Sequence, residues 1–171
     1  MPTDKSLRDA RLVFYKDDVY AINAILYAFL NQSAVKCALL IDKDGHMVTH
    51  RGSSKRIDLD TISALVAGSF AATREMARIL GEEEFSALYH QGKSDNIQLS
   101  LVGDRALLTA IFDETTTIGM VRLYATEAAK RLAVIFRKKA QETVAAGAPS
   151  GEADPAFKKS STAALDSLFG S

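Results

Sequence analysis

The stretch CALLIDKDGHMVTHR, residues 37–51, decides the fold of this 171-residue chain. Its continuous apolar run at 37–41 is typical of a strand buried on both faces. Asp and Gly at 42–45 favour a hairpin turn, because both residues tolerate left-handed backbone. Residues 46–51 then form the returning strand. The sequence therefore predicts a β-hairpin whose first strand lies inside a sheet.

Helical periodicity flanks this hairpin on both sides. Apolar residues recur every three or four positions over about 15–32, which predicts an amphipathic helix before the hairpin. After it we expect a long helix with an N-cap at Asp60 and an end at Gly81. A last long helix is expected to follow the threonines at 115–117.

Three more strands are expected between the second and third helices. They are a weak strand at 85–90, a half-buried strand at 97–102 and a second continuous apolar strand at 106–112. The predicted order is α-β-β-α-β-β-β-α, an α+β fold of the α/β sandwich type. Its sheet is five-stranded and mainly antiparallel, with the two apolar runs at the centre.

The ends of the chain differ in composition from this domain. We expect an N-terminal extension at 1–11, a folded domain at 12–144, a flexible linker at 145–160 and a C-terminal amphipathic helix at 161–171. Leu165, Leu168 and Phe169 form the apolar edge of that last helix, which is too short to be stable alone.

Composition excludes several classes of partner. Twenty-one basic and twenty-one acidic residues cancel, so we expect neither nucleic-acid nor membrane binding. A single cysteine, Cys37, excludes an internal disulfide. Neither a signal peptide nor a membrane-spanning run is visible, so we expect a cytoplasmic protein.

Motifs for chemistry are missing from the sequence as well. It holds no phosphate-binding loop, dinucleotide fingerprint or nucleophile elbow. The turn at 42–45 resembles part of a calcium loop, but Leu40 falls at the first ligand position. His46 and His50 would lie about 13 Å apart on a strand, too far to share one ion. We therefore expect no catalytic, cofactor or metal site.

The middle helix carries the most informative pattern. Its wheel places one set of residues on the side expected to face the sheet, with Phe70 at the margin: Ile62, Leu65, Val66, Ser69, Thr73, Met76 and Leu80. The opposite side is nearly bare of long side chains, and a glycine there weakens the helix. Small residues allow close approach of a partner, although alanine also fills exposed helix by default. The predicted docking face comprises Ala64, Ala67, Gly68, Ala71, Ala72, Glu75 and Arg78.

Several short blocks in order make the chain resemble the roadblock family. They are LVFY at 12–15, INA at 22–24, LIDKDG at 40–45, LVAG at 65–68, HQG at 90–92 and IFD at 111–113. The resemblance covers about 12–140. It implies the same element order and a homodimer formed through the middle helix and the third strand.

Within that family the resemblance is strongest to members that activate a Ras-like small GTPase in bacterial polarity and gliding systems. It implies a partner in the GTP-bound form whose own catalytic residues the dimer holds in place, with no inserted arginine. The C-terminal helix is implied to contact the GTPase separately, and the protein to concentrate at a cell pole. The alternative is a roadblock scaffold without GTPase-stimulating activity. An enzyme or a small-molecule sensor has little support, because no polar pocket is visible in the sequence.

Overall fold

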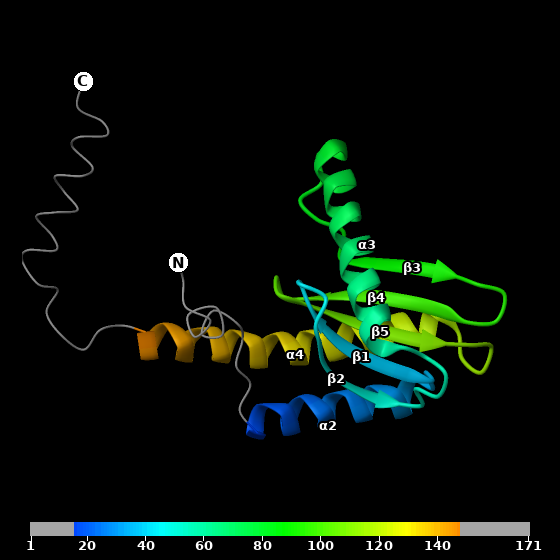
Figure 1. Cartoon of the computed structure of the whole chain (residues 1–171), viewed down its shortest axis with the longest axis horizontal. Helices are drawn as coiled ribbons and strands as arrows, with labels where there is room; N and C mark the ends of the chain where they lie inside the picture. Colours follow the sequence, from blue (N-terminus) through cyan, green and yellow to red (C-terminus); the bar gives the residue numbers. More distant parts are fainter. Residues whose placement is uncertain (1–15, 148–171) are drawn as a thin grey trace, which may run out of the picture. The chain divides into compact units, whose positions relative to one another are not determined.

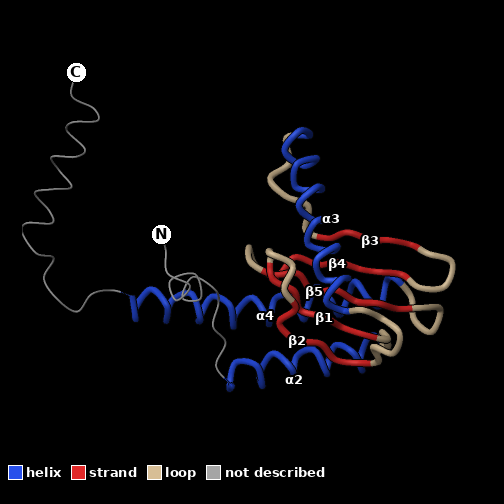
Figure 2. Tube along the Cα trace, viewed as in Figure 1, coloured by secondary structure: helices blue, strands red, loops and turns tan. Residues whose placement is uncertain are grey.

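The computed structural model describes residues 16–147, in which five strands form one antiparallel sheet (Figure 2). The strands lie in the order β2-β1-β5-β4-β3, and every neighbouring pair is antiparallel. Their bounds are Cys37–Asp42 (β1), Met47–Gly52 (β2), Ala87–Gln91 (β3), Asn96–Val102 (β4) and Ala106–Phe112 (β5). The expected five-stranded sheet, with both apolar runs inside it, is confirmed.

Three helices cover the two faces of this sheet (Figure 1). Helix α3, Leu59–Leu80, lies on one face, while α2, Lys16–Ser33, and α4, Ile118–Gly147, lie on the other. The order α-β-β-α-β-β-β-α is therefore the one expected. Because side chains alternate along a strand, each central strand contributes to both cores.

The alternation is clearest in β1. Cys37, Leu39 and Ile41 pack under α3 with Val66 and Phe70. The intervening Ala38 and Leu40 face α2 and α4 on the other side, in a larger core that includes Phe29, Phe112, Leu132 and Phe136. The thiol of Cys37 is fully buried, and burial raises its pKa, as expected for a small apolar residue in a core.

Some local expectations were wrong. The N-cap of α3 is Asp58, whose carboxylate accepts hydrogen bonds from the Thr61 backbone N–H and hydroxyl, while Asp60 lies in the first turn. Gly81 ends α3 in the left-handed conformation, as expected. Strand β4 is buried at Gln98, Leu99 and Ser100 rather than on one side only, because helices cover both faces of the sheet.

The ends lie partly outside the described residues. The chain divides into two compact units, Met1–Lys138 and Lys139–Ser171, and α4 continues from the first into the second. Helix α4 ends at Gly147, beyond the domain boundary expected at 144. The extension at 1–11 and the predicted contact residues Leu165, Leu168 and Phe169 lie outside the described residues. No helix within 16–147 has the length and apolar character needed to cross a bilayer.

Candidate functional site on helix α3

The side of α3 that faces the sheet overlaps only in part with the side expected from the wheel: Val66, Phe70 and Thr73 are buried as expected. Seven residues are buried there: Leu59, Ser63, Val66, Ala67, Phe70, Thr73 and Ala77. Leu65, Met76 and Leu80, which were expected to pack on the sheet, are 67%, 52% and 70% exposed. The helix is therefore rotated about its axis relative to the prediction.

Two hydroxyls are buried on this side of α3, and of these only Ser63 was not expected there. Ser63 donates to the Leu59 carbonyl and Thr73 donates to the Phe70 carbonyl, each at 2.7 Å. A hydroxyl satisfied within its own helix can be buried at low cost, so polar residues take core positions here. Val66 and Phe70 then fill the space against the sheet. The larger apolar side chains of α3 are left on the outside.

These outward residues form what we call the apolar stripe. It follows spacings of three and four residues from Leu65 to Ile79 along the exposed side of α3 and ends with the adjacent Leu80. Its members are Leu65, Gly68, Ala72, Met76, Ile79 and Leu80. From Leu65 to Ile79 it runs about 21 Å at the rise of an α-helix. The second half of α3 extends past the sheet next to β3 (Figure 1). Exposed apolar surface arranged in this way marks an interaction site.

Gly68, within the stripe, has no internal role in packing. A Cβ built on Gly68 would meet nothing within 4 Å outside the backbone of its own helix. Glycine at an exposed helical position costs about 1 kcal/mol relative to alanine. The packing of this chain therefore gives no reason for glycine at this position.

A second group of exposed residues, the small-residue flank, lies beside the stripe. It comprises Ala64, Ala71, Glu75 and Arg78. The Arg78 guanidinium donates to the Glu75 carboxylate at 3.0 Å, and this hydrogen bond lowers the pKa of Glu75. The Nε atom of Arg74 lies 3.2 Å from the Oε1 atom of Glu84, and the two side chains form an ion pair. The flank thus combines two alanines with one pair of opposite charges toward the end of the helix.

Ala67 does not belong to an exposed docking face, contrary to expectation. It is 8% exposed and lies beneath the β1–β2 turn. A Cβ at Gly45, which has a φ of +89°, would stand 3.0 Å from Ala64 Cα and 3.4 Å from Ala67 Cβ. The small side chains of Ala64 and Ala67 therefore allow the β1–β2 turn of the same chain to pack closely against α3. The remaining predicted residues are exposed, with Gly68 and Ala72 in the apolar stripe and the others in the flank.

Leu65, Met76, Ile79 and Leu80 are the site residues that sequence reasoning missed. The available signal was the number of large apolar residues on α3, which occupy more of the helix circumference than one sheet face can cover. Wheel geometry alone does not say which part of a broad apolar surface is buried.

Strand β3 provides a second feature near α3. It ends the sheet order, so its outer edge has no neighbouring strand within the described residues. Ala87, His90 and Gln91 are exposed along it. An edge of this kind can pair with another chain.

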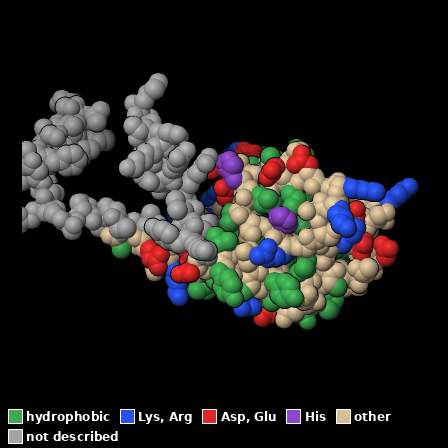
Figure 3. Space-filling model, turned by 60° about the horizontal axis from the view of Figure 1, so that its bottom comes forward, with side chains coloured by type: hydrophobic (Ala, Val, Ile, Leu, Met, Phe, Trp, Pro, Cys, Tyr) green, Lys and Arg blue, Asp and Glu red, His purple; other side chains and the backbone are tan. Residues whose placement is uncertain are grey.

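Other surfaces of the described chain are less distinctive. On the face that carries α2, hydrophobic side chains are scattered between charged ones (Figure 3). In the β1–β2 turn, ligand atoms of Asp42, Asp44 and His46 lie within 4.8 Å of one another. The Asp42 Oδ1 atom already accepts from the backbone N–H groups of Asp44 and His46, both at 2.9 Å. This geometry is that of a hairpin turn.

The fold and these sequence features define the class of protein. Residues 21–112 match the Roadblock/LC7 domain, and the chain belongs to the Roadblock/LC7 family.

Among solved structures, the chain is similar to the gliding protein MglB from Thermus thermophilus. The identity is 35% over 74% of this chain and 96% of that one, with a TM-score of 0.71. MglB from Myxococcus xanthus is 34% identical over 68% of this chain and 95% of its own, with a TM-score of 0.66. A Roadblock/LC7 domain from Streptomyces avermitilis, 14% identical, shares the fold with a TM-score of 0.61 over 67% of this chain and 96% of that one. No curated protein sequence matches the chain.

Proposed function

We propose that this protein is a homodimeric GTPase-activating protein for a Ras-like bacterial GTPase of the MglA type in its GTP-bound form. The observation that carries the proposal is the exposed apolar stripe on α3, in a chain about one third identical to MglB. The protein acts in cell polarity or gliding motility, in the cytoplasm and concentrated at a pole. It supplies no catalytic residue and holds the catalytic groups of the GTPase in place.

The apolar stripe serves the homodimer. Interfaces between permanent partners are more apolar than the rest of a protein surface, and a two-fold dimer brings the same patch of both copies together. Leu65, Met76 and Ile79 supply large side chains, while Gly68 lets the two helices approach closely. The edge of β3, beside the extended half of α3, pairs with its counterpart in the second copy.

The small-residue flank serves the GTPase. Interfaces that form and dissociate during a regulatory cycle are more polar, and charges at their rims guide orientation. Ala71 offers a flat surface, with the Glu75–Arg78 pair at its edge. The C-terminal segment, through Leu165, Leu168 and Phe169, adds a separate contact that modulates nucleotide exchange.

Ala71→Arg tests this assignment. We expect the variant to fold and to form dimers, because Ala71 is exposed and lies outside the stripe. Its affinity for the GTPase is expected to fall by a factor of about 100, because a long charged side chain must be desolvated in the contact. The measurement is phosphate release by the Ras-like GTPase from the same genome, with oligomeric state followed by light scattering.

Ala24→Arg is the matched control. Ala24 is an exposed alanine on α2, on the other face of the sheet, and this variant is expected to stimulate GTP hydrolysis fully. Full stimulation by Ala71→Arg would contradict the docking role of the flank. A wild-type dimer that binds the GTPase without accelerating hydrolysis would favour the alternative, a roadblock scaffold.

A further inference from the structure

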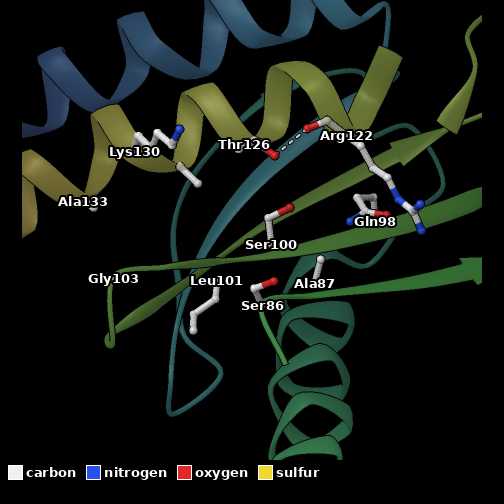
Figure 4. Close-up of a pocket in the computed structure, with 11 residues that line it drawn as sticks. Ser86, Ala87, Gln98, Ser100, Leu101, Gly103, Arg122, Thr126, Lys130 and Ala133 are labelled. Atoms are coloured by element: carbon white, nitrogen blue, oxygen red, sulfur yellow. Dashed lines mark hydrogen bonds between the residues drawn. The ribbon is translucent and has the colours of Figure 1, made fainter. Parts of the chain in front are cut away.

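A pocket lies between α4 and the outer strands of the sheet, on the opposite face from α3 (Figure 4). Its volume is about 330 Å³, within the range of small-molecule sites. Ala87, Ala129 and Ala133 are among its lining residues, and their small side chains leave space between helix and strands. The wall toward the sheet includes Ser86, Gln98 and Ser100.

The charged residues of the pocket all have the same sign. Arg122 and Lys130 line it from α4, and its lining contains no acidic side chain. Among the described residues, no carboxylate forms an ion pair with either cation. By contrast, Lys36, Arg74 and Arg78 all have acidic partners. The pocket therefore favours an anion.

Arg122 is positioned by an aromatic pair. Its guanidinium carbon lies 5.9 Å from the centroid of the Tyr89 ring, close enough for a cation–π interaction. The Tyr89 ring in turn stacks on Phe112, with their centroids 6.1 Å apart. A guanidinium held in this way loses less conformational entropy when it binds an oxyanion.

A buried amide at the Arg122 end of the pocket lacks a hydrogen-bond donor. Gln98 is 1% exposed, and its Nε2 group donates to the Leu99 carbonyl at 3.2 Å. Its Oε1 atom accepts no hydrogen bond. A buried polar atom without a partner is costly, and such atoms often mark binding sites. Gln98 and the Arg122 guanidinium lie side by side in this view (Figure 4).

We propose that this pocket binds a small anionic molecule that joins a carboxylate or phosphate to a hydroxyl or N–H group. Arg122 and Lys130 bind the oxyanion. The hydroxyl or N–H group donates to Gln98 Oε1 once the amide turns toward the cavity. The two cations are eight residues apart, about 12 Å along α4, so they approach the ligand from different ends of the pocket. The chain then acts as a sensor as well as a GTPase regulator.

Three small molecules test this inference on the full-length chain in its native oligomeric state. Malate and succinate are both dicarboxylates and differ only in one hydroxyl, while glycerol phosphate presents a phosphate with hydroxyls. Binding is followed by the NMR shift of the Gln98 side-chain amide at constant ionic strength. We expect a saturable shift with malate or glycerol phosphate, and the stronger of these two identifies the oxyanion. Malate is expected to bind more tightly than succinate.

Arg122→Gln and Lys130→Gln should each weaken binding by about tenfold or more, since each removes a charge-assisted hydrogen bond. Arg131→Gln is the control, because it makes the same charge change at an exposed residue of α4 outside the pocket. No saturable shift with any of the three molecules would overturn the proposal, and so would equal losses in all three variants. Equal binding of malate and succinate would overturn the role of Gln98. None of these outcomes depends on GTPase activation.

Discussion

Gly68 and Gly45 show two different uses of glycine around the same helix. Gly45 has a left-handed backbone and lies against Ala64 and Ala67, so its place in the turn is explained within the chain. Gly68 has ordinary helical geometry and open space where a Cβ would stand. The proposed dimer would explain a glycine that weakens its own helix, and this explanation can be tested by substitution.

Gly68→Ala is expected to have opposite effects on folding and on assembly. In a monomeric background such as Leu65→Glu, it should raise the free energy of unfolding by about 0.5–1 kcal/mol, because alanine loses less backbone entropy. In the otherwise wild-type chain it should weaken the dimer, because the added methyl group separates the two helices. Urea unfolding measures the first effect and sedimentation measures the second. A dimer of unchanged affinity would show that no partner approaches Gly68.

Helix α3 also shows how far the sequence could predict the structure. Its existence and its end at Gly81 followed from periodicity and capping, and the place of β1 and β5 inside the sheet followed from their continuous apolar runs. Its exact orientation could not be predicted, because Ser63 is buried through a hydrogen bond to the Leu59 carbonyl of its own helix. A helix wheel treats this hydroxyl as polar and the exposed Leu65 as a core residue. The sequence could predict the helix but not which of its large apolar residues are exposed.

Leu65→Glu tests whether the apolar stripe forms the dimer interface. We expect the dimer dissociation constant to rise by about 100-fold or more, because a carboxylate would have to be buried without a partner. The fold should persist, since Leu65 is 67% exposed. Leu123→Glu is the control, because Leu123 is 62% exposed on α4, across the sheet from α3. Light scattering at micromolar concentration should find a monomer for Leu65→Glu and a dimer for Leu123→Glu. The reverse result would exclude the stripe as the interface.

In the folded domain, one sheet separates two kinds of surface. The α3 side carries the apolar stripe and the small-residue flank, and the α4 side carries a pocket lined by Arg122 and Lys130. The pocket could not be predicted from the sequence. Its lining comes from β3, β4 and α4, and neither Gln98 nor Ser100 belongs to any motif. The residues of β3 and β4 come together beneath α4 through the register of the two strands. In this register Ala87 pairs with Ser100, and Tyr89 pairs with Gln98.

Removing residues 160–171 tests the separate role of the C-terminal segment. We expect the truncated chain to remain a dimer and to stimulate GTP hydrolysis, but to bind the GTPase more weakly, because a tethered contact adds effective concentration. Calorimetric titration of the GTPase measures the loss. Replacing Leu165, Leu168 and Phe169 together by serine in the full-length chain should weaken GTPase binding to the same extent. A truncated chain that no longer dimerises would show that the segment belongs to the dimer interface.

The outward orientation of Leu65, Met76 and Ile79 has a consequence for the amount of protein that a cell must make. When a surface is buried only by a second copy, the free energy of unfolding of each chain increases with protein concentration, because of mass action. At low expression the monomeric chain would expose the apolar stripe to chaperones and proteases. In the proposed homodimer, pairing would protect this surface. The lifetime of the protein would then rise with its own concentration.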